Sequence, residues 1–342
     1  MKPSRSRLLS LRNSQKPNTP LAPFVRGFLK RVLNSVAKHN LWQQDDSFIV
    51  AVSGGPDSLC LLDVLYLLSL KFGFSLHVAH VNYRLRGKDS DLDEALVRER
   101  ATVYGLSLSV LHPRITHSAN LEEKLRDIRY RFFEKVRLAK KATLIAVAHH
   151  EDDQAETLLL RLLRGSGSLG LSAMRPKHGV IVRPLLEQSR EDILHYLDVR
   201  GLSYRTDQSN SDRAFLRNRI RHELLPLLKR DYQPRIVPIL RETATRLATD
   251  FAHLGESSSL SPSEKTGLLS VRALLTLSDT LLQVRLRHLL RPYTGGRFPS
   301  QGVIDEVLKL LKSTKNKPQI FVTKGLKIER KGDRVRLLRQ GA

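Results

Sequence analysis

The pattern of hydrophobic and polar positions is clearest over residues 48–68. Residues 48–52 are five consecutive apolar or small side chains, typical of a strand buried on both faces. A Ser-Gly-Gly-Pro turn follows, and leucines then recur at helical spacing from Leu59 to Leu68, so we expect a helix to begin near Asp57. The sequence therefore predicts a strand, a glycine-rich turn and a helix in direct succession.

Strand and helix patterns alternate on both sides of this stretch. Further strand patterns cover residues 76–82, 106–111 and 142–148. Helical patterns cover residues 24–41, 89–104 and 120–140. Such alternation predicts an α/β fold over residues 23–185, with a doubly wound, mostly parallel, Rossmann-like sheet.

Two further regions are expected after the sheet. Residues 186–256 predict a helical region, and a Ser-rich stretch with a proline at residues 257–264 predicts a linker. Residues 265–342 predict a small α+β module. Its helical patterns cover residues 271–290 and 303–311, and its three short strand patterns lie between residues 320 and 338.

The chain begins with a basic segment that predicts little packed structure. Residues 1–22 are rich in Ser, Pro, Arg and Lys, and no acid occurs before Asp45. This composition is typical of a disordered basic tail, and an organellar transit peptide is the alternative. We favour the tail, because an amphipathic helical pattern is poorly developed there.

Charge and cysteine usage narrow the function classes. The 342 residues carry 58 Lys plus Arg against 34 Asp plus Glu, a net charge of +24, which favours a polyanionic partner such as nucleic acid. The single cysteine, Cys60, excludes an intrachain disulfide framework and any CxxC motif, as expected for a cytoplasmic protein. No run of 18 apolar residues predicts a membrane span.

The turn after the first strand is the strongest candidate for chemistry. Glycines let the backbone approach a ligand closely, and the first N–H groups of a helix lack intrahelical partners, so such a turn binds anions. The hydroxyls of Ser53 and Ser58 add donors. A carboxylate at Asp57 repels a phosphate, which suggests a bridging Mg²⁺ there. The Gly-x-x-x-x-Gly-Lys-Ser/Thr phosphate loop is absent from this sequence.

An acidic cluster follows the fourth strand pattern. Residues 149–156 read His-His-Glu-Asp-Asp-Gln-Ala-Glu, and Asp153 and Glu156 share a helix face because they are three apart. Acids are favoured in a first helical turn by the helix dipole, but two histidines and four acids exceed what capping requires. His-x-x-x-His spacing is missing, which argues against zinc and favours a Mg²⁺ role for the carboxylates.

Arginines gather at three further places. Arg84 and Arg86 follow the second strand pattern, and Arg161 and Arg164 flank a glycine-rich stretch that predicts a plain linker, a lid or an RNA-facing loop. A third group stands just before a run of leucines. It consists of Arg217, Arg219 and Arg221. In a strongly basic chain these groups are candidate phosphate contacts.

The six residues of the turn resemble the SGGxDS motif of the PP-loop ATP pyrophosphatases. They are Ser53, Gly54, Gly55, Pro56, Asp57 and Ser58. Taken with later motifs, residues 48–228 resemble the tRNA(Ile)-lysidine synthetase family of PP-loop enzymes. The later motifs are residues 80–87, 126–130, 149–157, 161–167 and 217–222. Two positions depart from the family pattern, since Tyr83 replaces the usual His and Glu151 replaces a commoner Ala or Val.

The resemblance implies an activity and its partners. Members of the family convert the wobble cytidine of a CAU-anticodon tRNA(Ile) to lysidine. ATP adenylates O2 of the base, and free L-lysine then attacks C2 and expels AMP. The resemblance thus implies ATP, Mg²⁺, lysine and tRNA as ligands, with the helical region and the C-terminal module both contacting tRNA. A homodimer is compatible with the sequence.

The family's motif positions also imply roles for individual residues. ATP would be bound by the six residues of the turn, with Asp57 organising Mg²⁺ and pyrophosphate. Asp153 and Glu156 would handle the cytosine and the lysine ammonium, and Arg129 would steady the activated base or phosphate. The arginines of the three groups above would contact tRNA.

Three rival functions remain open at this point. A tRNA 2-thiolation enzyme shares the activation of a base oxygen by ATP, but that chemistry generally uses paired cysteines or an iron–sulfur cluster, which Cys60 alone cannot supply. A non-catalytic RNA-binding protein would not require Asp57, Asp153 and Glu156 together. A ligase acting on a small molecule would leave the charge of +24 unexplained.

Overall fold

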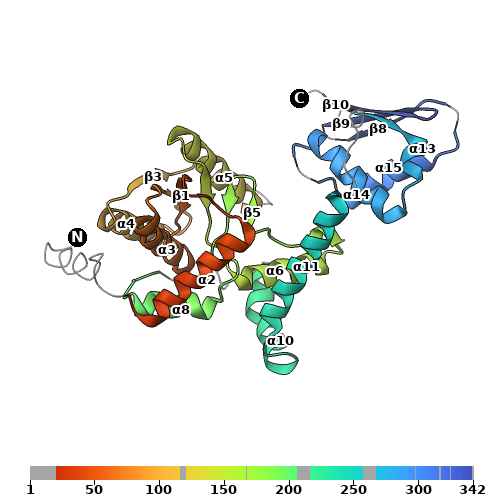
Figure 1. The fold of residues 1–342 in the computed structure, drawn as a ribbon. Coiled ribbons are helices and arrows are strands. Elements are labelled where there is room, and N and C mark those ends of the chain that lie inside the picture. Colours follow the sequence, from red (N-terminus) through yellow and green to blue (C-terminus); the bar gives the residue numbers. More distant parts are fainter. Residues whose placement is uncertain are drawn as a thin grey trace. The chain divides into compact units, whose positions relative to one another are not determined.

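The computed structural model describes residues 21–115, 121–166, 168–205, 216–256, 267–296, 298–315, 317–323 and 325–340 (Figure 1). The chain divides into two compact units. Unit 1 comprises Met1–Leu163 and Met174–Glu242, and unit 2 comprises Arg164–Ala173 and Thr243–Ala342. The expected basic tail lies almost wholly outside the described residues, as does the expected linker.

Unit 1 is built on a six-stranded sheet in the order β3-β2-β1-β4-β6-β5. Its strands are β1 Phe48–Ala51, β2 Leu76–Val81, β3 Ser107–Leu111, β4 Leu144–Ala146, β5 Lys177–His178 and β6 Ile181–Val182. All neighbouring pairs are parallel except β5 and β6. The predicted doubly wound, mostly parallel sheet is therefore confirmed, and β1 lies at its centre.

Helices cover both faces of this sheet. They are α2 Pro23–His39, α3 Pro56–Phe72, α4 Lys88–Val103, α5 Leu121–Ala139, α6 Glu151–Leu163 and α8 Arg190–Val199. Alternate residues of β1 point to opposite faces. Phe48 and Val50 pack in the core formed with α2, α3, α4 and α8, whereas Ile49 packs with Phe133 and Val136 of α5. Figure 1 shows α2 lying along α8.

An ion pair joins the end of α2 to the segment before α8. Glu187 accepts hydrogen bonds from Lys38 at 2.8 Å and from His39 at 2.9 Å. These bonds, led by the one from His39, lower the pKa of the Glu187 carboxyl to about 2.

A helical region follows α8 in unit 1. It contains α9 Leu216–Arg219, the π-helical turn η2 Ile220–Leu224, α10 Leu225–Asp231 and the start of α11 Ile236–Glu256, which passes into unit 2 at Thr243. Ile220 and Leu225 pack against Ala155 and Leu159 of α6. Pro226 stands in the first turn of α10, where its missing N–H cannot complete an α-helical bond to the preceding turn.

Unit 2 contains a four-stranded antiparallel sheet in the order β7-β10-β9-β8. Its elements are α7 Ser168–Leu171, β7 Leu268–Ser270, α13 Val271–Leu275, α14 Asp279–Leu290, η3 Arg291–Tyr293, α15 Gln301–Lys312, β8 Gln319–Thr323, β9 Leu326–Lys331 and β10 Arg334–Arg339. The expected α+β module is thus present. The helix expected over residues 271–290 is broken, because the Ser278 side chain accepts from the Leu281 N–H and starts α14 anew.

The compact units differ from the expected ranges. Residues 186–242 pack within unit 1, and the short segment Arg164–Ala173 belongs to unit 2. None of the described helices combines the length and the hydropathy needed to cross a bilayer.

Candidate active site

The turn between β1 and α3 is held in a conformation that requires glycine at one position. Gly54 has a φ of +96°, which L-residues rarely adopt. A Cβ at Gly54 would lie 3.2 Å from the Cβ of Asp93 and 3.3 Å from its carbonyl oxygen. Asp93 is itself fixed by Arg86 at 2.6 Å and Arg205 at 2.8 Å. At Gly55, by contrast, a Cβ would meet only the Ser53 hydroxyl at 3.6 Å.

The two serines of the turn stabilise it internally. The Ser58 hydroxyl donates to the Gly55 carbonyl at 2.9 Å and accepts from the Ser53 N–H at 3.1 Å. Gly55 caps α3 without a side-chain hydrogen bond to the helix. The first N–H groups of α3 are therefore left for an anionic ligand.

Two cavities adjoin at this turn. The smaller one, about 200 Å³, has an apolar wall that includes Val52, Val81 and Phe133. The larger one, about 740 Å³, is lined mainly by charged side chains of unit 1. Four residues line both cavities: Ser53, Gly55, Asp57 and Arg129. A single ligand could therefore span the turn, with one part against the apolar wall of the smaller cavity and its charged part in the larger one.

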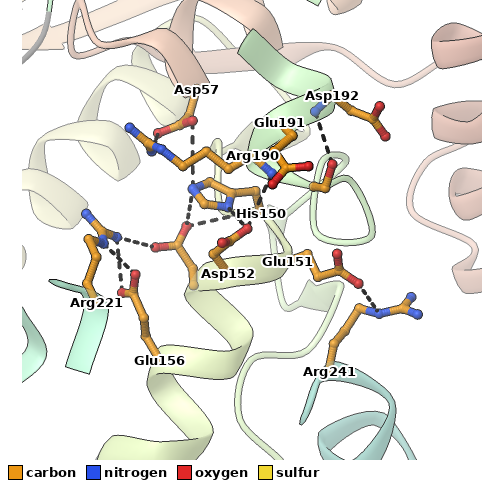
Figure 2. A network of polar contacts seen from close by, with 12 residues as sticks. Asp57, His150, Glu151, Asp152, Glu156, Arg190, Glu191, Asp192, Arg221 and Arg241 are labelled. Carbon is orange, nitrogen blue, oxygen red and sulfur yellow. Dashed lines mark hydrogen bonds and ion pairs between the residues drawn. The ribbon is translucent and has the colours of Figure 1, made fainter. Parts of the chain in front are cut away.

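Asp57 faces the larger cavity between two cations (Figure 2). Its carboxylate lies 3.7 Å from Nε2 of His150 and 3.6 Å from the Arg190 guanidinium. Burial raises the pKa of Asp57, while the charges of His150 and Arg190 oppose that shift. The Oδ1 atom is buried and makes no hydrogen bond.

His150 connects Asp57 to the acidic cluster at the start of α6. It is 1% exposed, and its ring nitrogens lie 3.4 Å from Asp152 and 3.6 Å from Asp153. Burial lowers the pKa of His150, but the surrounding carboxylates, Asp153 above all, outweigh burial and raise it to about 9. His150 is therefore a buried cation at neutral pH.

The neighbouring histidine, His149, is neutral rather than positively charged. Burial lowers the pKa of His149 to about 3, so the ring is neutral. Its Nδ1 accepts a hydrogen bond from Arg183 at 3.2 Å, which assigns the proton of the neutral ring to Nε2. His149 lines the smaller cavity.

Asp153 and Glu156 are paired with two arginines of the helical region. Arg217 contacts Glu156 at 2.8 Å and Asp153 at 3.0 Å, and Arg221 contacts Glu156 at 2.5 Å and Asp153 at 3.2 Å. Glu156 is fully buried, and Asp153 is 8% exposed. Burial opposes ionisation of Asp153, but His150, His149 and these arginines hold its pKa well below the usual range.

The expected RNA-contacting arginines lie in different environments. Arg86 pairs with Asp93, and Arg217 and Arg221 hold the carboxylates just described. Arg219 instead lies 3.7 Å from Glu223, and its side chain is 60% exposed. Arg84, Arg161 and Arg164 lie outside this constellation. A phosphate contact by any of these arginines stays a prediction.

Two residues of the site were not assigned a role from the sequence. His150 was visible in the acidic cluster, but nothing in the sequence reveals that its ring faces three carboxylates. Arg190, the first residue of α8, gave no signal at all. Glu151, which departs from the family pattern, pairs with Arg241 of α11 at 2.9 Å and so joins α11 to the start of α6 (Figure 2).

The donor set suits a Mg²⁺ ion held jointly with a nucleotide. No group of three or more His, Cys, Asp or Glu side chains in the described part of the chain could hold a metal alone. Mg²⁺ is commonly bound by one or two carboxylates plus phosphate oxygens. The unbonded Oδ1 of Asp57, beside the turn between β1 and α3, would provide one such ligand.

Comparison with known families assigns the fold of this site. The model of the PP-loop domain matches residues 26–228. The chain belongs to the PP-loop domain family. The match continues past the expected boundary at residue 185 and covers α9, which carries Arg217, η2, which carries Arg221, and the first residues of α10.

Relatives of this PP-loop protein are similar over two thirds of the chain. The tRNA(Ile)-lysidine synthase of Geobacter sulfurreducens is 48% identical over 237 residues, or 67% of this chain and 50% of that protein. That of Bacteroides thetaiotaomicron is 40% identical over 223 residues, or 64% and 51%. The chain thus spans about half the length of these relatives. The U34-tRNA thiolase NcsA of Methanococcus maripaludis, with a TM-score of 0.55 and 18% identity over 66% of this chain and 79% of its own, shares the fold.

Proposed function

We propose that this protein is a tRNA(Ile)-lysidine synthetase. The observation that carries the proposal is the meeting of the two cavities at the turn, with Asp57 and Arg129 on both and with Asp153 and Glu156 grouped beside the larger one. The name of the relatives with 48% and 40% identity supports it. ATP is the nucleotide that the PP-loop domain would bind.

Each cavity suits a different part of the reaction. The smaller cavity, about 200 Å³ with an apolar wall, suits the adenine, and the turn would then receive the phosphates on its N–H groups. The cavity of about 740 Å³ is large enough to take a flipped-out cytosine and a lysine side chain. An anticodon loop exposes its bases, so presenting one base costs little stacking energy.

The first step joins the base to AMP. Oxygen O2 of the cytosine attacks the α-phosphorus, the new O–P bond forms, and the bond to pyrophosphate breaks. The N–H groups of the turn and the Arg129 guanidinium, which lines both cavities, would stabilise the negative charge that develops, as preorganised donors do. Asp57 would hold Mg²⁺, which neutralises phosphate charge when bound.

The second step replaces AMP with lysine. The amino group attacks C2, the C2–O bond to AMP breaks, and the amine loses a proton. Asp153 and Glu156 would orient the lysine ammonium and accept from the cytosine amino group. Because Arg217 and Arg221 hold both carboxylates in the ligand-free protein, substrate must share or displace these contacts.

The rival 2-thiolation chemistry is not favoured by the environment of Cys60, the one cysteine of the sequence. Cys60 is fully buried among the leucines of α3, and burial raises the pKa of its thiol well above the usual value. Such a thiol is a poor nucleophile. The likeness to the thiolase is a likeness of fold.

Unit 2 is proposed to help dock the tRNA. One face of its sheet is buried, through Ile328, Val335 and Leu337. The exposed residues of β10 on the other face include Arg334 and Arg336, which suit a phosphate backbone. Replacing both arginines with Gln should raise the tRNA concentration needed for turnover and leave ATP binding unchanged. Unaltered tRNA affinity would assign unit 2 a structural role only.

The proposal is tested by incubating the full chain with tRNA transcripts, ATP, Mg²⁺ and labelled lysine, followed by nucleoside analysis. Lysidine should form only in a CAU-anticodon tRNA(Ile), with one AMP and one pyrophosphate for each lysidine. Pyrophosphate release without lysine incorporation would refute the proposed function. We expect the reaction to take place in the cytoplasm, and assembly as a homodimer stays a prediction.

A further inference from the structure

Arg190 stands out among the cations of the larger cavity. It is the first residue of α8, and its backbone N–H donates to Asp152 at 3.3 Å, which fixes the start of the helix beside the acidic cluster. Its side chain is 41% exposed and reaches the cavity wall next to the turn between β1 and α3. Figure 2 shows the side chain extending toward Asp57.

The other arginines on this cavity wall are mostly engaged by closer carboxylates. Arg86 and Arg205 hold Asp93 at 2.6 and 2.8 Å, and Arg221 holds Glu156 at 2.5 Å. Arg190 lies 3.6 Å from Asp57, beyond hydrogen-bonding distance. Its guanidinium therefore has donors to offer to a ligand without first breaking a hydrogen-bonded ion pair.

The chemistry proposed for the site produces a leaving group that such a donor would stabilise. Breaking the bond between the α-phosphorus and its leaving oxygen leaves a pyrophosphate that takes up the electron pair and carries at least three negative charges near neutral pH. A planar guanidinium can bond two phosphate oxygens at once and stays charged throughout. Arg129 lines both cavities and is placed for the α-phosphate, whereas Arg190 lines only the larger one.

We propose that Arg190 binds the β- and γ-phosphates of ATP and stabilises the pyrophosphate leaving group. This inference rests on the proposed function, in that it takes ATP as the substrate. In this proposal Arg190 is a catalytic residue that contacts the pyrophosphate, whereas Asp153 and Glu156 contact the lysine and the base.

The test compares Arg190→Gln with Lys229→Gln in the full chain. Lys229 lines the same cavity, but its ammonium pairs with Glu191 at 3.0 Å, so this variant removes the same charge from another part of the wall. Binding of ATP, AMP and inorganic pyrophosphate is measured by calorimetry for both variants and for the unchanged protein. Thermal unfolding is recorded to show that each variant is folded.

Arg190→Gln should weaken binding of ATP and of pyrophosphate by about 10- to 100-fold, because a charge-assisted contact to a desolvated phosphate is lost, while AMP binding changes by less than about twofold. Lys229→Gln should leave all three affinities nearly unchanged. Arg190→Lys should bind pyrophosphate more tightly than Arg190→Gln but less tightly than the unchanged protein, because an ammonium keeps the positive charge and lacks the bidentate geometry of a guanidinium.

Two outcomes would overturn the inference. Equal pyrophosphate affinity in Arg190→Gln and the unchanged protein would show that Arg190 does not touch the leaving group. Equal losses for AMP and pyrophosphate would show a general disturbance of the pocket. Failure of the proposed function is distinguishable, because it would appear as absent lysidine formation in the unchanged protein, whatever the binding of ATP.

Discussion

Replacing Gly54 with alanine should destabilise unit 1, whereas the same change at the adjacent Gly55 should not. Gly54 has a φ of +96°, and holding an L-residue in so sparsely populated a region costs on the order of 1–3 kcal/mol. The added Cβ would also lie 3.2 Å from the Cβ of Asp93, closer than the optimum of about 3.5–4.0 Å between carbons. Asp93 cannot easily withdraw, because it is held by Arg86 and Arg205.

The magnitude follows from adding these two costs. Crowding of one extra methyl group in a packed site typically costs about 1–3 kcal/mol, so Gly54→Ala should lose roughly 2–6 kcal/mol of unfolding free energy. At Gly55 the Cβ makes only an ordinary contact at 3.6 Å. The smaller entropy of the unfolded chain then offsets the weaker cap, and Gly55→Ala should stay within about 1 kcal/mol.

The chain contains its own reporter for this measurement. Trp42 is its single tryptophan, and its ring packs edge-on against Phe48 at 5.2 Å in the core of unit 1. Tryptophan fluorescence during urea unfolding therefore reports on unit 1 alone. The midpoint should fall for Gly54→Ala at an unchanged m-value.

A second readout separates stability from ligand binding. Gly55 lines both cavities, so Gly55→Ala should weaken ATP binding although the domain stays stable. Equal unfolding midpoints for the two variants would refute the reasoning, because the backbone at Gly54 would then tolerate a side chain.

Four further predictions concern single residues. Asp57→Asn should abolish pyrophosphate release and retain tRNA binding in a filter assay; near-normal release would end its assignment. Arg217→Ala should lower the free energy of unfolding in urea by about 2–4 kcal/mol, because it removes a partner from buried carboxylates. Arg219 is exposed, so Arg219→Ala should change the free energy of unfolding by no more than about 0.5 kcal/mol. The Arg219 variant should instead lower the salt slope of tRNA binding by about one. A larger loss of stability for Arg219→Ala than for Arg217→Ala would contradict the roles given to these two arginines. Cys60→Ala should retain most lysine incorporation, with a stability loss of about 1–2 kcal/mol; a folded variant without incorporation would give the thiol a chemical role. The pKa of Glu187 is lowered to about 2 in the folded protein, so its contribution to stability is present above its ordinary value of about 4.5 and is lost as the pH falls from there toward 2. In Glu187→Gln, the free energy of unfolding should therefore fall less steeply as the pH is lowered from about 4.5 toward 2. An unchanged pH dependence would show that the contacts of Glu187 with Lys38 and His39 add no stability.

Much of the fold could be predicted from hydrophobic periodicity. The strands from β1 to β4 and the helices between them fall close to their expected positions, because each pairs a buried apolar run with an amphipathic segment. Strands β5 and β6 were missed, since each has only two residues and no period can be read from so short a segment.

The site was less predictable, because its partners are distant in the chain. The cluster Arg217, Arg219 and Arg221 is equally consistent with phosphate contacts and with carboxylate contacts. The carboxylates that hold two of its members lie more than 60 residues earlier. Arg190 could not be predicted for the same reason, since nothing about a single arginine at the start of a helix indicates that it faces the turn between β1 and α3.

The division of the chain between its two units sets an order for synthesis on the ribosome. Segment Arg164–Ala173 belongs to unit 2, yet the rest of that unit begins at Thr243, about 70 residues later. At about 5–20 residues per second, this segment emerges roughly 4–14 s before any other part of its unit. Any packing of the nascent PP-loop domain before Thr243 is translated therefore takes place while this segment, which includes α7, lacks the rest of its unit.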